Sequence, residues 1–254
     1  MRALIVSDIH ANLPALEAVL AAAPQYDVVW NLGDIVGYGA NPNEVVELAK
    51  KLGGIAVRGN HDRACSDPFV FSLHSRMNPI AATAAVWTDR VLTKESRDWL
   101  LSLPRGPLKP LKRSLICVHG SPWDEDEYIS SEFDAEAALA SCRDRIVLFG
   151  HTHDQGAWIS NQGALEPLKP DFKSREGVVD FELSLRRRNN RYLLNPGSVG
   201  QPRDGDWRAA FAVYDDTEAI LTWYRVPYNV RTAQRRILRA ELPETLATRL
   251  RDGT

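Results

Sequence analysis

The sequence has little cysteine, no strong excess of either charge and no long apolar run. Its three cysteines, Cys65, Cys117 and Cys142, form no Cys-x-x-Cys pair, which argues against a disulfide framework or a thiolate zinc site. The formal net charge of −2 does not favour nucleic acid or an anionic membrane as a partner, although nucleic acid stays open as a substrate. No apolar run reaches the roughly 18 residues of a membrane helix. We therefore expect a cytoplasmic protein without a membrane partner.

The hydrophobic content of 44% over 254 residues is enough to bury a sizeable core. We expect one domain over residues 1–254, with a helical cap-like insertion at about 63–113. Short, continuous apolar runs predict strands that are buried on both faces and covered by helices. These runs lie at 2–7, 28–31, 55–58, 115–118 and 146–149.

Two other segments show different patterns. In the insertion, we predict helices over 79–91 and 94–102, with Thr93 as the N-cap of the second, and we expect His74 to be a solvated or core residue. From 178 to 226 the apolar residues alternate, which predicts antiparallel strands that form a second sheet. Residues 160–177, rich in Pro, Gly and Lys, resemble a surface loop, and the chain from Val230 is predicted to be helical and basic.

Side chains that suit metal ions follow five of the predicted strands. Loops at the carboxyl ends of strands in an α/β sheet converge on one crevice, so residues distant in sequence can meet there. Oxygen and imidazole ligands without thiolate suit Mn, Fe, Zn or Ni better than Mg alone. Five of the six histidines fall within the motifs Asp8-Ile-His10, Gly33-Asp34, Gly59-Asn60-His61-Asp62, His119-Gly120 and Gly150-His151-Thr152-His153.

In this order, the five motifs resemble the calcineurin-like metallophosphoesterase family. The stretches Gly33–Gly39 and Asn195–Gly200 resemble its bacterial and archaeal phosphodiesterase branch. The resemblance implies an α/β fold, a four-layer α/β/β/α sandwich of two mixed β-sheets flanked by helices. It also implies two divalent metal ions, with Asp34 bridging them. One ion would be held by Asp8, His10, Asp34 and His153, and the other by Asp34, Asn60, His119 and His151.

The resemblance assigns catalytic roles to two neighbouring residues. His61 would protonate the leaving oxygen, and Asp62 would either orient His61 or merely cap the next helix. Ala11 departs from the family pattern, because many relatives place Gly after the Asp-x-His motif. If the backbone there needs a positive φ, Ala11 would be strained.

The Asn-Pro-Gly-Ser turn at 195–198, which follows the apolar pair at 193–194, supplies candidate substrate-binding residues. Asn195, Ser198 and Arg203 could reach the substrate phosphate, with Arg203 as a bidentate clamp, and a purely structural turn fits the pattern equally well. The acidic run 124–127 is expected to be a solvated loop near the mouth of the cleft.

These motifs predict a dinuclear metal-dependent phosphoesterase. We expect a metal-bridging hydroxide to attack a phosphodiester, with His61 as the general acid, on a small phosphate ester or a nucleotide. A phosphomonoesterase or nucleotidase would use the same ions. A noncatalytic metal-binding scaffold is the alternative from another class. The sequence leaves open the natural substrate, the native metal, for which manganese is one choice, and the oligomeric state.

Overall fold

The structure is a computed structural model that describes residues 1–67, 69, 77–111 and 114–254. His74 and parts of the predicted insertion therefore lie outside the described residues. None of the helices in these ranges is both long and apolar enough to cross a membrane.

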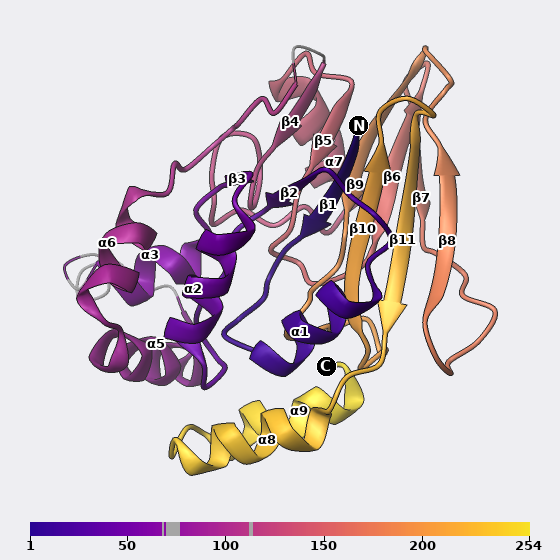
Figure 1. The fold of residues 1–254 in the computed structure, drawn as a ribbon. Coiled ribbons are helices and arrows are strands. Elements are labelled where there is room, and N and C mark those ends of the chain that lie inside the picture. Colours follow the sequence, from indigo (N-terminus) through magenta and orange to yellow (C-terminus); the bar gives the residue numbers. More distant parts are fainter. Residues whose placement is uncertain (68, 70–76, 112–113) are drawn as a thin grey trace.

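The first sheet has six strands and carries the N-terminus (Figure 1). The three strands at one side are parallel, and the other three are joined to them by antiparallel pairing. In spatial order the strands are β3 (Ile55–Ala56), β2 (Val28–Asn31), β1 (Arg2–Val6), β10 (Ala209–Asp215), β11 (Ile220–Val226) and β8 (Val179–Ser184).

The second sheet has five strands and is also mixed. Its first three strands in spatial order are parallel, and the last two form an antiparallel hairpin. The order is β4 (Leu115–Cys117), β5 (Ile146–Leu148), β9 (Asn190–Asn195), β6 (Gly156–Asn161) and β7 (Ala164–Leu168).

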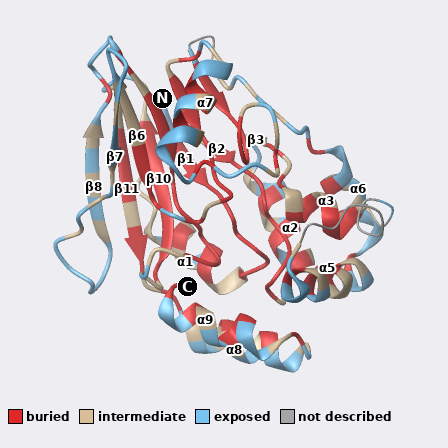
Figure 2. Cartoon of the chain, turned by 180° about the vertical axis from the view of Figure 1, so that it is seen from behind, coloured by how far each residue is buried: buried red, intermediate tan, exposed pale blue. Residues whose placement is uncertain are grey.

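The two sheets pack face to face because successive side chains of a strand point to opposite faces. In β1, Ala3 and Ile5 join a core with β4 and β5, whereas Leu4 and Val6 join a core with helices. Figure 2 shows the central strands buried and the edge strands β7 and β8 more exposed. The helices on the outer face of the first sheet are α1 (Leu13–Ala22), α2 (Pro42–Leu52), α8 (Val230–Arg239) and α9 (Glu244–Asp252).

A single described helix, α7 (Glu132–Ser141), covers the outer face of the second sheet through Ala135, Ala138 and Leu139. The layers are therefore helices, sheet, sheet and helix (Figure 1). This arrangement confirms the predicted four-layer sandwich of two mixed sheets flanked by helices.

Three further helices lie beside α2: α3 (Asn60–Ser66), α5 (Pro79–Val91) and α6 (Lys94–Ser102). The Thr93 hydroxyl accepts the backbone N–H of Ser96 at 3.1 Å, which is the predicted N-cap of α6. Buried side chains of all three helices belong to the same core as α1 and α2. We infer that the chain is one domain in which the helical segment is an insertion.

Two sequence predictions about the sheets are wrong. Strands β8, β10 and β11 do not form a separate second sheet, because β10 pairs with β1 and so extends the first sheet. The supposed loop at 160–177 contains the end of β6 and all of β7. Pro167 is tolerated in β7 because an edge strand does not need every backbone N–H for pairing.

Candidate metal centre

The five predicted motifs meet beyond the ends of β1, β2, β3, β4 and β5. Two groups of buried carboxylate and imidazole side chains place their ligand atoms within 4.8 Å of one another, and both groups contain Asp34. The first group is Asp8, His10, Asp34 and His153, and the second is Asp34, His119 and His151. The structure therefore brings together the acidic and histidine ligands that the sequence predicted.

Two carboxylate oxygens point into this cluster without a partner. Asp8 Oδ1 and Asp34 Oδ2 are buried and accept no hydrogen bond from any described residue. An unsatisfied buried carboxylate oxygen is costly, since the group has lost its hydration. Asp8 Oδ1 lies 3.3 Å from His153 Nε2, and Asp34 Oδ2 lies 3.4 Å from His119 Nε2. These oxygens fit cation ligands.

Each of the four histidines uses one ring nitrogen to donate to a backbone carbonyl. Such a bond fixes the tautomer and orients the other nitrogen toward a metal. In three of them the donor is Nδ1, and in His151 it is Nε2. The pairs are His10 with Val36 (3.1 Å), His119 with Leu32 (2.8 Å), His153 with Gln201 (2.6 Å) and His151 with Asp126 (3.1 Å).

The free ring nitrogens then face one another. His10 Nε2 and His153 Nε2 are only 3.1 Å apart, and with both Nδ1 atoms acting as donors each Nε2 presents a lone pair. Two lone pairs at this distance repel unless a cation lies between them. Asn60, the remaining predicted ligand, lies beside the second group, with Oδ1 3.2 Å from His119 Nε2. Imidazole, carboxylate and amide ligands fit Mn, Fe, Zn or Ni.

The electrostatics of the ligands also suit cations. Burial lowers the pKa of His10 and His153 well below the usual value, and burial with the neighbouring His119 lowers the pKa of His151 to about 3. These rings are neutral, the form that binds metals. Burial also acts against charge on His119, but the Asp34 carboxylate outweighs it and raises the pKa of His119 to about 10.

The ligand loops hold a strained backbone. All five of the following ligands have a left-handed φ between +49° and +66°: Asp8, His10, Asp34, His151 and His153. Ala11 has a φ of +51°, so the strain expected for Ala at this position is present. Non-glycine residues in this region cost energy and persist only where the surroundings fix them, which is typical of functional sites.

Glycines allow the loops to approach closely. Gly59 has an ordinary φ of −95°, but a Cβ added there would lie against the Asp34 carboxylate. Gly33 has a φ of +96°, and an added Cβ would be 2.7 Å from the backbone nitrogen of Gly59. Both positions require glycine because the Asp34 loop and the Asn60 loop touch there.

The two predicted catalytic residues, His61 and Asp62, have different surroundings. His61 packs edge-on against His10, with ring centroids 4.9 Å apart, and its Nδ1 is buried without a hydrogen bond to the described residues. Burial lowers the pKa of His61 to about 4. Asp62 accepts the backbone N–H groups of Ile35, Val36 and Gly59 at 2.8 to 3.1 Å. This geometry connects Asp62 to the ligand loops and not directly to His61.

Two of the three predicted substrate-binding residues brace the ligand loops. The Asn195 amide donates to the Gly150 carbonyl and to Thr152 Oγ1, both at 3.0 Å. Ser198 Oγ donates to the Asp8 carbonyl at 2.8 Å. Both side chains are buried, an arrangement that favours a positioning role over the predicted contact with substrate.

Arg203 lies at the site with part of its hydrogen-bonding capacity unused. Its Nη2 is 3.0 Å from Gln201 Oε1 and 3.4 Å from the Tyr38 hydroxyl, and its guanidinium carbon is 5.8 Å from the centre of the Tyr38 ring. The buried Nε of Arg203 has no hydrogen-bond partner among the described residues. A phosphate oxygen fits this guanidinium.

The acidic run 124–127 was predicted to be a solvated loop, which is wrong for Glu125. The Glu125 side chain is only 1% exposed and is bonded to Arg58 and Arg63. Arg63 also binds Asp126, whose carbonyl accepts His151 Nε2. This network could not be predicted from sequence, because the segment is irregular and has no periodicity.

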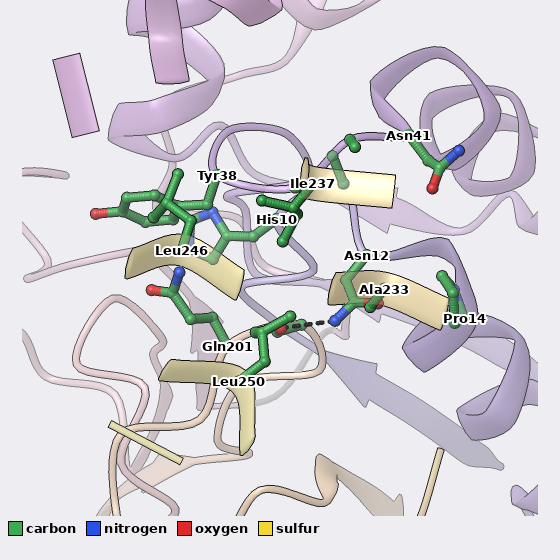
Figure 3. A pocket seen from close by; sticks show the side chains of 14 residues that line it. His10, Asn12, Pro14, Tyr38, Asn41, Gln201, Ala233, Ile237, Leu246 and Leu250 are labelled. Carbon is green, nitrogen blue, oxygen red and sulfur yellow. Dashed lines mark hydrogen bonds between the residues drawn. The ribbon is translucent and has the colours of Figure 1, made fainter. Parts of the chain in front are cut away.

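The C-terminal helices close the back of the site. Figure 3 shows a narrow pocket in which Ile237 of α8 and Leu246 and Leu250 of α9 lie beside His10 and Tyr38. These apolar side chains exclude water from the rear of the ligand loop.

The fold and the two ligand groups are those of a metal-dependent phosphoesterase. A model of the calcineurin-like phosphoesterase superfamily domain matches residues 1–218. The chain belongs to the calcineurin-like phosphoesterase superfamily, and the resemblance seen in its motifs is confirmed.

Individual relatives agree with this assignment. The chain is 34% identical to the uncharacterized protein MJ0912 of Methanocaldococcus jannaschii, over 97% of this chain and 96% of that protein. It is 30% identical to a symmetrical bis(5′-nucleosyl)-tetraphosphatase of Glaesserella parasuis, over 57% of this chain and 51% of that protein.

Solved structures support the fold. A metallophosphoesterase from Sphaerobacter thermophilus has a TM-score of 0.84 at 38% identity, with both chains fully covered. A hypothetical protein, PH1004, from Pyrococcus horikoshii has a TM-score of 0.76 at 21% identity, covering 100% of this chain and 98% of that one.

Proposed function

We propose that the chain is a two-metal phosphodiesterase that uses Mn, Fe, Zn or Ni. The observation that carries the proposal is the position of Asp34 Oδ2, which lies 3.7 Å from His10 Nε2 and 3.4 Å from His119 Nε2 without a hydrogen-bond partner among the described residues. One oxygen thus belongs to both ligand groups. When bound, two ions would acidify a water and stabilise charge on the phosphoryl oxygens.

The residues of the chain would bind and orient the ester. Two divalent ions would bring four positive charges, and Asp8 and Asp34 carry two negative charges. The site would therefore keep a net positive charge that attracts a phosphate ester. Arg203 would bind a phosphoryl oxygen with its free Nε edge. Tyr38, which packs edge-on against His10 and lies under the Arg203 guanidinium, would hold the guanidinium in place.

His61 would protonate the leaving oxygen. In the ion-free chain burial keeps this ring neutral near pH 7, since its pKa is about 4. A positioned acid is worth roughly 10²- to 10⁴-fold for an alkoxide leaving group.

The first test combines metal analysis with turnover. The purified protein should contain two metal ions per chain and should hydrolyse bis(nitrophenyl) phosphate faster than nitrophenyl phosphate with Mn, Ni or Zn. Preference for the monoester would favour a phosphomonoesterase. Two bound ions without turnover of either ester would favour a noncatalytic scaffold.

The second test addresses His61. The His61→Ala variant should keep both metals but lose roughly 10²-fold or more activity on an alkyl ester. It should lose far less on a nitrophenyl ester, whose leaving group needs no proton. Equal losses on the two esters would remove His61 from the acid role.

A further inference from the structure

Tyr128 forms an aromatic wall directly beside the metal ligands. Its ring is stacked on the His151 ring, with centroids 3.9 Å apart and an interplanar angle of 23°. Tyr128 nevertheless remains 49% exposed, while His151 is buried. Because one face of the phenol ring is covered by His151, the exposed surface belongs to its other face and its edge.

The position of Tyr128 is fixed by ion pairs two and three residues earlier, of which the Glu125 carboxylate is buried. Glu125 is held between Arg58 and Arg63, and Asp126 forms a second ion pair with Arg63. Arg63 lies in α3, the helix that begins with Asn60 and His61. The segment that carries Tyr128 is thus attached to the helix of the catalytic motif, so the exposed ring is held and not free to fold away.

We infer that Tyr128 is a specificity-determining residue that stacks on a planar aromatic group, such as a nucleobase or an aryl ring, in the part of the phosphodiester that is retained after cleavage. This inference rests on the proposed function. A phosphate bound at an ion held by His151 would bring its ester substituents close to Tyr128, because the Tyr128 ring is stacked on His151. An aromatic ring that is fixed in position and half-exposed offers such a substituent apolar contact and stacking. Stacking of this kind does not depend on a particular base.

Two diesters with the same leaving group isolate this contact. Bis(nitrophenyl) phosphate and methyl nitrophenyl phosphate both release nitrophenolate, and only the first retains an aromatic group. With saturating Mn, Tyr128→Leu should reduce kcat/KM for the bis-aryl ester about tenfold more than for the methyl ester. Tyr128→Phe should keep the wild-type ratio, because it retains the ring.

The matched control is Phe133→Leu. Phe133 is another exposed aromatic residue, five positions further along the chain and 78% exposed, and this change should leave the ratio unaltered. Equal losses on both esters in Tyr128→Leu would overturn the inference, because they would show that Tyr128 only shields His151. An unchanged ratio with unchanged rates would overturn it as well. If the wild-type protein with two ions cleaves neither diester, the proposed function itself is wrong.

Discussion

Asp34 belongs to both ligand groups, and this leads to a prediction about how metal ions affect stability. In Asp34→Asn, the amide keeps an oxygen that can accept the backbone N–H of His61, the bond that Asp34 Oδ1 accepts at 2.8 Å. The change removes the negative charge and replaces Oδ2 with an amide nitrogen. Because Oδ2 belongs to both ligand groups, we expect this single substitution to weaken both ion sites.

The size of the effect follows from linkage. An ion that binds only the folded state stabilises it by about 2.7 kcal/mol when its free concentration is 100 times Kd. Two such sites contribute about 5 kcal/mol. For a chain of this size, 1 kcal/mol shifts Tm by about 2–4 °C, so Mn should raise the Tm of the wild-type protein by roughly 10–20 °C. The Asp34→Asn variant should show less than about a third of that rise.

The assay is thermal unfolding of EDTA-treated protein during a Mn titration. The control is Asp154→Asn, which changes a carboxylate next to His153 that belongs to neither of the ligand groups found among the described residues. This control should retain the full rise in Tm. A full rise in Asp34→Asn would refute the claim that Asp34 serves both ions.

Two further predictions concern packing. Gly59→Ala should fold but bind fewer than two ions, because the new Cβ meets the Asp34 carboxylate. The control Gly163→Ala, at a φ of +93° with open space around it, should lose about 1–2 kcal/mol of stability and keep both ions. Metal analysis and denaturant unfolding of the two variants would test this, and the reverse pattern would contradict it. Burial raises the pKa of the Cys65 and Cys117 thiols, so a thiol reagent at pH 8 should modify only Cys142 rapidly in the native protein and all three after unfolding. Rapid modification of all three native thiols would contradict the buried positions of Cys65 and Cys117.

The ligand set could be predicted from sequence because the chemistry is local to strand ends. Each short apolar run predicts a buried strand. When the ends of five such strands converge, Asp and His side chains that follow them, such as Asp8 and His10, indicate a metal site. The same reasoning located β2 and the Thr93 cap, since apolar runs and capping residues act over a few neighbouring positions.

The missed features depend on contacts between distant segments. Alternating apolar residues predict that β10 is a strand, but the pattern does not say that it pairs with β1. Pro167 made an edge strand resemble a loop. Tyr128 lies in an irregular segment whose position depends on Glu125 and its two arginines, so no spacing in the sequence placed the ring on His151.

The most direct test of the metal centre is anomalous diffraction from a crystal of this protein grown with Mn. The account predicts two anomalous peaks roughly 3.5–4 Å apart, with the Asp34 carboxylate bonded to both. A single peak, or two peaks of which Asp34 contacts only one, would contradict it.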